Sequence, residues 1–197
     1  MTYALLIVDV QYDFLPGGAL GLPNGDSILL PIRNMAHNAL RAGGRNLIIA
    51  SRDWHPENHF SFSDDPRYLD QSWPPHCVQG TKGARIHPSV RKYADYVISK
   101  GMNRNEEAYS VFQGKTLRPV RHLEEILDES GVDTVVVCGL ALDVCVRYTA
   151  LDANALGYKT IVPLDSTVGL NDDSIQETLD AFLRAGVHTP GTFDASQ

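Results

Sequence analysis

The chain has 197 residues, a length that favours one domain with a full hydrophobic core. Apolar residues make up 43% and charged residues 21% of the sequence, which is ordinary for a globular protein. The formal net charge of -7 argues against nucleic acid and anionic membranes as partners. The net charge does not argue against a small neutral molecule as substrate.

The N-terminal residues and the cysteine content bear on location. The chain starts with Met1, and the apolar run that follows is too short for a signal peptide and lacks a basic start. No apolar run approaches the length of a membrane-spanning helix. The three Cys residues form no even disulfide framework, which indicates a reducing compartment. We therefore expect a cytoplasmic protein; its oligomeric state stays open, a homo-oligomer included.

Strand and helix patterns alternate along the chain. Short apolar runs rich in β-branched residues predict buried strands, and apolar residues at helical spacing predict helices. In chain order, we expect strand Ala4–Val10, helix Ile28–Ala42, strands Leu47–Ala50 and Tyr96–Ser99, helix Leu117–Ser130, strand Thr134–Gly139, helix Val144–Leu156, strand Thr160–Pro163, helix Ser174–Ala185 and a weaker sixth strand, Gly186–Thr189. This alternation predicts a three-layer α/β fold: a six-stranded, mainly parallel sheet in the order 3-2-1-4-5-6 with helices on both faces.

One connection departs from this alternation of strands and helices. Residues 51–93 show no sustained periodicity, yet they contain five prolines, both Trp residues and four of the seven His. Long structureless connections in a compact domain are usually functional. We read residues 1–197 as a single domain, with residues 51–93 as an insertion that binds metal and substrate.

A cluster of potential metal ligands lies in this insertion. Asp53, His55 and His59 fall within seven residues, directly after a predicted strand, and His76 follows in a proline-rich loop. Carboxylate and imidazole together are usual ligands of Zn²⁺, Fe²⁺ and Mn²⁺. Because the set contains no Cys, it favours a catalytic or substrate-anchoring metal over a structural zinc site.

Other reactive residues follow predicted strands. Asp9 ends the first strand, Lys100 follows the third, and Cys145 lies where the chain leaves the fourth strand and enters a helix. The carboxyl ends of parallel strands meet at one edge of the sheet, where ligands bind. A helix start and a nearby Lys would lower the thiol pKa, and a carboxylate could move its proton. The amides near Ala141 and Cys145 could hold an oxyanion, so this set fits acyl transfer from an amide.

Several longer motifs carry a resemblance. They are Leu6-Ile7-Val8-Asp9-Val10-Gln11-Tyr12-Asp13-Phe14, Arg52-Asp53-Trp54-His55-Pro56, Trp73-Pro74-Pro75-His76-Cys77-Val78-Gln79-Gly80-Thr81, Lys100-Gly101 and Gly139-Leu140-Ala141 with Asp143 and Cys145-Val146. With these motifs in this order, the chain resembles the nicotinamidases of the isochorismatase-like cysteine hydrolase superfamily. The resemblance spans most of the chain.

The resemblance implies a function and roles for residues. The activity would be conversion of nicotinamide to nicotinate and ammonia through a thioester, with pyrazinamide also accepted and a place in pyridine nucleotide salvage. It implies a catalytic triad, one divalent ion (Zn or Fe, with Mn as a third option), no organic cofactor and a non-proline cis peptide between Leu140 and Ala141. The implied residues are Asp9, Lys100 and Cys145 for catalysis; Ala141 and Cys145 for the oxyanion; Phe14, Trp73, Leu140 and Ala141 for substrate; and Asp53, His55 and His76 for metal. His59 would ligate directly or hydrogen-bond a metal-bound water.

Two other readings stay open. One is a related cysteine amidohydrolase that acts on a carbamoyl or ureido compound; those relatives lack the metal cluster, so Asp53, His55 and His76 weigh against it. The other is a non-enzymatic metal-binding or thiol-redox protein. Cys138 and Cys145 are the Cys residues that would have to form its redox pair. Isochorismate hydrolases lack the nucleophilic Cys.

Overall fold

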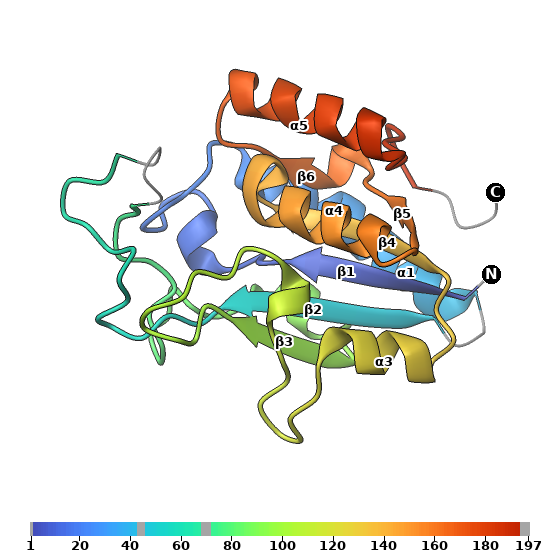
Figure 1. Cartoon of the computed structure of the whole chain (residues 1–197), viewed down its shortest axis with the longest axis horizontal. Coiled ribbons are helices and arrows are strands. Elements are labelled where there is room, and N and C mark those ends of the chain that lie inside the picture. The colour runs from blue at the N-terminus through green and yellow to red at the C-terminus, as the bar shows by residue number, and fades with distance from the viewer. Residues whose placement is uncertain (1, 43–45, 68–71, 194–197) are drawn as a thin grey trace.

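The core of the protein is one parallel sheet, seen in a computed structural model that describes residues 2–42, 46–67 and 72–193 (Figure 1). Its strands are β1 (Tyr3–Val8), β2 (Leu47–Asp53), β3 (Tyr96–Lys100), β4 (Thr134–Leu140), β5 (Lys159–Ile161) and β6 (Thr167–Val168). The order is β3-β2-β1-β4-β5, β6 pairs with β4, and the pairs between these strands are parallel.

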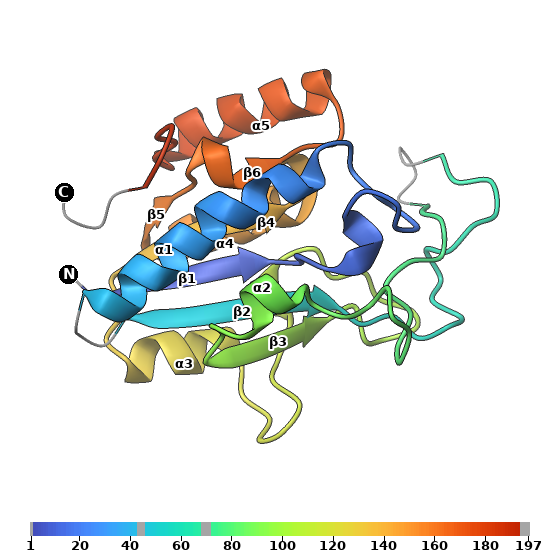
Figure 2. The ribbon, with the colours of Figure 1, turned by 180° about the vertical axis from the view of Figure 1, so that it is seen from behind.

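Helices cover both faces of this sheet and bury its strands. The helices are α1 (Leu29–Arg41), α2 (Pro88–Arg91), α3 (Leu123–Glu129), α4 (Arg147–Ala155) and α5 (Asp172–Ala185). The side of α1 and α2 faces the viewer in Figure 2, and the side of α3, α4 and α5 faces the viewer in Figure 1. Along β1, Leu5 and Ile7 pack toward α1 and α2, whereas Leu6 and Val8 pack toward α3, α4 and α5. The expected three-layer α/β fold is confirmed.

The sixth strand lies at a different place from the predicted one. β5 pairs only with the first half of β4, and β6 covers the second half at Gly139 and Leu140. The segment Gly186–Thr189, predicted as this strand, makes an isolated bridge between His188 and Ile161. Backbone hydrogen bonds still join this segment to β5 and the residues after it: the His188 amide donates to the Thr160 carbonyl, and the Val162 amide donates to the His188 carbonyl. Pro190 has no N–H to donate, so the pairing is not extended beyond it.

The predicted helix Leu117–Ser130 begins later than expected, at Leu123. Residues 116–121 instead form a loop that Thr116 closes, because its hydroxyl accepts from the Arg121 amide. Pro119 disfavours helical geometry in the residue before it, and His122 with Glu125 then caps the helix. The predicted helix Val144–Leu156 is preceded by one π-helical turn, η4 (Leu142–Val146), that leads into α4.

No helix in the described ranges combines the length and apolar character needed to cross a bilayer. The segment 51–93 holds the end of β2, a long loop and the short helix α2; its residues 68–71 lie outside the described part. The strands β2 and β3 lie on one side of β1, and β4 and β5 lie on its other side, so the strand order reverses at β1. In open α/β sheets, ligands bind beside the carboxyl ends of strands at such a point.

Candidate active site

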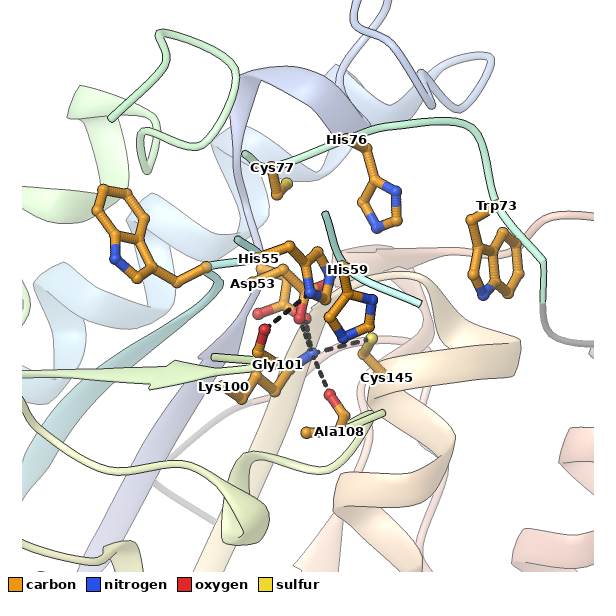
Figure 3. Close-up of polar contacts among 12 residues, drawn as sticks. Asp53, His55, His59, Trp73, His76, Cys77, Lys100, Gly101, Ala108 and Cys145 are labelled. Carbon is orange, nitrogen blue, oxygen red and sulfur yellow. Dashed lines mark hydrogen bonds and ion pairs between the residues drawn. The ribbon is translucent and has the colours of Figure 1, made fainter. Parts of the chain in front are cut away.

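Lys100 contacts the other two reactive residues that the sequence places at strand ends, Asp9 and Cys145, and Figure 3 shows its contact with Cys145. Its Nζ lies 2.9 Å from Asp9 Oδ2 and 3.3 Å from Cys145 Sγ. It also donates to Asp53 Oδ1 at 2.5 Å and to the Ala108 carbonyl at 3.1 Å. The structure thus brings Asp9, Lys100 and Cys145 together, and it adds Asp53 to the same cluster.

Asp9 is held rigidly at the end of β1. Its φ of 49° lies in the left-handed region, which Asp adopts more readily than most residues. Ser51 on the neighbouring strand β2 donates its hydroxyl to Asp9 Oδ1 at 2.7 Å and accepts the Asp9 amide at 3.2 Å. Both side chains are buried, so the carboxylate has a fixed direction toward Lys100.

Cys145 sits in η4 and is buried, with 6% of its surface exposed. Burial raises the pKa of its thiol well above the ordinary value, and although Lys100 lowers it, Asp9 and Asp53 raise it further. The expected low pKa of the free thiol is therefore not found, because a thiolate would be fully desolvated beside two carboxylates. Potential ligand atoms of Asp9 and Cys145 lie within 4.8 Å of each other, so the Asp9 carboxylate is a candidate acceptor for the thiol proton.

The charges of this cluster shift one another. Burial raises the pKa of Asp9, and the Asp53 carboxylate adds to this effect while Lys100 opposes it. Burial alone would lower the pKa of Lys100, but the carboxylates of Asp53 and Asp9 outweigh it and hold that pKa well above its usual value. The ammonium therefore stays charged, and Asp9 can take and return a proton.

Asp53, His55 and His76 have the geometry of a metal site. One ligand atom from each lies within 4.8 Å of the others. His55 Nδ1 is 2.9 Å from the Gly101 carbonyl, and His76 Nδ1 is 2.8 Å from the Pro74 carbonyl. A carbonyl only accepts, so both Nδ1 atoms are donors and both Nε2 lone pairs are left for a metal.

The lowered pKa of His55 is also favourable for metal binding. Burial, followed by the nearby His76 and His59, lowers the pKa of His55 to about 2. The imidazole is thus neutral at physiological pH, the form that binds metals. The donor set of one carboxylate and two neutral imidazoles fits Zn²⁺ or Fe²⁺.

His59 lies next to this group but is engaged elsewhere. Its ring centroid is 4.3 Å from that of His55. However, its Nδ1 is 2.8 Å from the Ser61 hydroxyl and its Nε2 is 3.0 Å from the Glu106 carbonyl. Direct ligation through Nε2 would require loss of the bond to Glu106. His59, His55 and Glu107 form a second group of potential ligands within the same 4.8 Å limit.

A pocket of about 420 Å³, partly open to solvent, connects the two clusters. The lining residues are Phe14, Leu20, Leu22, Asp53, His55, Trp73, His76, Glu107, Tyr109, Ala141, Val144, Cys145 and Leu170. Predicted substrate residues Phe14, Trp73 and Ala141 are among them. Leu140 is not, because its side chain is fully buried in the core on the α1 side of the sheet.

The peptide between Leu140 and Ala141 is cis, as the resemblance implied. Ala141 also begins the turn that carries the thiol, since its carbonyl accepts from the amides of Val144 and Val146. The Ala141 and Cys145 residues therefore border the same pocket from one short segment.

Sequence reasoning missed residues that hold the site in place. Gln11 clamps the backbone of Asp53: its Oε1 accepts from the Asp53 amide and its Nε2 donates to the Asp53 carbonyl, both at 2.8 Å. Tyr109 accepts a hydrogen bond from the Trp73 indole at 3.1 Å. Gln11 lies within a motif noted in the sequence, whereas nothing in the pattern around Ser51 or Tyr109 pointed to the site.

A parallel sheet flanked by helices, with a buried thiol, ammonium and carboxylate beside a candidate metal site, is typical of one class of protein, hydrolases with a three-layer α/β fold. Comparison with known families agrees with this class. The isochorismatase domain model matches residues 3–190, and the chain belongs to the isochorismatase family.

Individual relatives are similar over nearly their whole length. Nicotinamidase from Escherichia coli (strain K12) is 40% identical over 192 residues, covering 91% of this chain and 89% of that protein. Nicotinamidase/pyrazinamidase from Mycobacterium tuberculosis is 39% identical, covering 93% of this chain and 96% of that protein. The crystal structure of pyrazinamidase from Pyrococcus horikoshii in complex with zinc superposes with a TM-score of 0.84 at 37% identity, covering 98% of this chain and all of that one (100%).

Proposed function

We propose that this protein is a metal-dependent cysteine amidohydrolase that converts nicotinamide to nicotinate and ammonia and also accepts pyrazinamide. One observation carries the proposal: Lys100 Nζ contacts Cys145 Sγ, Asp9 and Asp53 at once, and Cys145 and Asp53 line a small pocket. The activities of the similar proteins support the choice of substrate.

Cys145 would attack the carboxamide carbon while Asp9 removes the thiol proton. The raised pKa of Asp9 favours this transfer, because a buried carboxylate accepts a proton readily. Lys100 would stabilise the anionic partners at each stage. The amides of Ala141 and Cys145 would hold the oxyanion of the tetrahedral intermediate.

The intermediate would collapse as Asp9 returns the proton to the amine, which leaves as ammonia. The product of this half-reaction is a thioester on Cys145. Water would then attack the thioester carbon with Asp9 as base, and the C–S bond would break to release nicotinate. The proton held by Asp9 would return to Cys145 and restore the thiol.

Phe14 and Trp73 would contact the two faces of the pyridine ring. Both aromatic side chains line the pocket, and the hydrogen bond from Trp73 to Tyr109 fixes the indole. Asp53, His55 and His76 would hold a divalent ion, which when bound would anchor the ring nitrogen and order water. These ligands would thereby select amides that carry a ring nitrogen.

The first test is ammonia release from nicotinamide by the purified protein. We expect turnover in the native chain, turnover of pyrazinamide as well, and loss of activity in Cys145→Ala. Cys138→Ala is the matched control, because Cys138 is a buried Cys in β4 that does not line the pocket. Normal turnover by Cys145→Ala would disprove the covalent mechanism.

The second test removes the metal. We expect that rigorous chelation abolishes ammonia release and that Zn²⁺, Fe²⁺ or Mn²⁺, supplied singly, restores it to different degrees. Metal analysis of the purified protein before and after chelation gives the occupancy. Full activity at an occupancy near zero would refute the metal's role and leave the triad standing.

The other readings make different predictions. An amidohydrolase for carbamoyl or ureido compounds would release ammonia from those compounds and not from nicotinamide. A non-enzymatic thiol protein would show no substrate protection. Thiol titration with and without nicotinamide distinguishes it, because in the enzyme substrate should protect Cys145, the Cys that lines the pocket. The cysteines Cys77, Cys138 and Cys145 are all free, which supports the proposed cytoplasmic location.

A further inference from the structure

A second cleft, at the outer edge of β3, is rich in arginine and plays no part in the proposed reaction. Its empty volume is about 990 Å³, part of it open solvent. The lining residues are Arg52, Arg91, Asp95, Tyr96, Val97, Ser99, Thr116, Leu117, Arg118, Pro119 and Arg121. A neighbouring cleft shares Arg52 and Arg91 and adds Arg85. Positive charge is therefore concentrated at one place on a chain whose net charge is -7.

Little of this positive charge is neutralised. Within the described part of the chain, Arg121 pairs with Glu129 at 2.6 Å, and no carboxylate lies within ion-pair distance of Arg52, Arg91 or Arg118. The carboxylate in the cleft, Asp95, already accepts from the Ile48 amide. A cleft with several uncompensated guanidinium groups is stabilised when an anion enters it.

Arg52 is held in position for such a ligand. Its guanidinium carbon lies 3.7 Å from the ring centroid of Trp54, and its Nε donates to Ser99 Oγ at 3.0 Å. The stacking on Trp54 and the hydrogen bond from Nε fix the plane of the Arg52 guanidinium group. Its two terminal nitrogens have no hydrogen-bond partner among the residues described. Burial and, second, the charge of Arg91 lower the pKa of Arg52, which shows that the two groups repel each other.

We infer that this cleft binds a small phosphate-bearing molecule, with Arg52 and Arg91 as the main contacts and Arg118 at the rim. A fixed guanidinium fork matches two oxygens of a phosphate group, and a second arginine can engage the third. The concave shape and the acidic remainder of the surface favour a small ligand over a nucleic acid.

The cleft borders the candidate active site along the sheet. Arg52 pairs with Ser99 across β2 and β3, and the next residues, Asp53 and Lys100, form the next pair in the register. Side chains of successive strand residues point to opposite faces, so the two sites are separate but share a rigid backbone.

Titration of the intact, metal-loaded protein with adenosine monophosphate and with inorganic phosphate tests the inference. Tryptophan fluorescence gives the signal, because Trp54 lies under Arg52. Chloride keeps the ionic strength constant. We expect saturable binding of both phosphates, no binding of adenosine, and a dissociation constant raised about tenfold in Arg91→Gln. Arg91→Glu should bind both phosphates still more weakly.

The two ligands distinguish two kinds of recognition. Stronger binding of adenosine monophosphate than of inorganic phosphate would show that the ligand is an organic phosphate. Equal binding of the two would show that the phosphate group alone is recognised.

Arg184→Gln is the matched control, because Arg184 is exposed on α5 and lines neither cleft. It should bind both phosphates like the native protein, and circular dichroism should show that all three variants are folded. A non-saturable response, equal binding in Arg91→Gln and the native chain, or equal binding of adenosine and its phosphate would each overturn the inference.

Discussion

At the scale of single residues, Lys100 and Asp53 connect the two halves of the candidate site. Asp53 Oδ1 accepts from Lys100 at 2.5 Å, and a carboxylate oxygen of Asp53 also lies among the potential metal ligands. Lys100 in turn touches Asp9 and Cys145. The set of metal ligands and the thiol are thus one electrostatic unit, in which a change at either end alters the other.

Gly101 tests how closely the metal ligands are packed. A Cβ at Gly101 would lie 2.4 Å from Cε1 of His55, so Gly101→Ala must displace the ring. We expect this change to lower metal affinity by about ten- to a hundredfold, because the Gly101 carbonyl orients His55. Metal titration of the chelated variant, together with ammonia release, measures the effect.

Gly131→Ala is the control for backbone strain. Gly131 has a φ of 63°, almost the same as the 61° of Gly101, but nothing lies within 4 Å of its added Cβ. Both variants should lose about 1–2 kcal/mol of stability from the left-handed backbone. Only Gly101→Ala should lose metal; equal metal affinity in the two variants would contradict the packing argument.

Residues whose contribution comes from their own chemistry could be predicted from the sequence. Asp9, Lys100 and Cys145 are reactive groups at the ends of apolar runs, and the parallel sheet brings such ends together. Ser51 could not be predicted, because its role depends on a contact with Asp9, 42 residues earlier. The predicted lowering of the Cys145 thiol pKa was wrong in direction, because burial raises this pKa. A helix start and a nearby Lys can be read from a sequence, but burial cannot.

At the scale of elements, the turn that carries the thiol is anchored to the loop before α5. Asp143 in η4 accepts from the Leu170 amide with both oxygens, at 2.9 and 3.1 Å, and from the Ser174 hydroxyl. Leu170 lines the same pocket as Cys145. One carboxylate therefore connects a wall of the pocket to the segment of the candidate nucleophile.

We expect Asp143→Ala to loosen that wall. The variant should lose about 1 kcal/mol of stability, because two partly buried donors lose a charged acceptor. Its KM for nicotinamide should rise several-fold. Steady-state kinetics and thermal unfolding measure both effects. Asp173→Ala, an exposed carboxylate in the first turn of α5, should leave KM unchanged; a similar rise in KM there would assign the effect to α5 and not to the anchor.

The elements differ in how well a sequence can predict them. β4 could be located because its sequence is a short apolar run rich in Val, and α5 because Asn171 caps its start and Gly186 ends it. β6 has two residues, too few to show any periodicity, and it exists only because β5 leaves half of β4 unpaired. The delayed start of α3 depends on the side chain of Thr116, which no helical pattern reports.

At the scale of the whole molecule, buried His55 makes the stability of the chelated protein depend on pH. Its pKa is lowered to about 2 in the folded chain, from an ordinary value of 6.5. Above pH 6.5 the imidazole is neutral in both states, and His55 causes no pH dependence. Below that value the unfolded chain binds the proton and the folded chain does not, so stability falls by about 1.4 kcal/mol per pH unit.

Chemical denaturation of the chelated protein between pH 7 and pH 5 measures this slope. His55→Gln should reduce the slope by about one proton. His37→Gln, which changes an exposed side chain on α1, should leave it intact. A slope that is the same in His55→Gln and the native chain would show that other groups cause the acid sensitivity.

The central place of β1 has a consequence for synthesis. The first strand made is the middle of the sheet, and it needs β4, where Tyr3 lies opposite Thr134, before its second edge is paired. Until the ribosome has released residues 134–140, a fully apolar strand has one open edge, which is prone to wrong pairing. Asp9 ends that strand and Cys145 follows its late partner, so the candidate active site can form only after most of the chain has emerged.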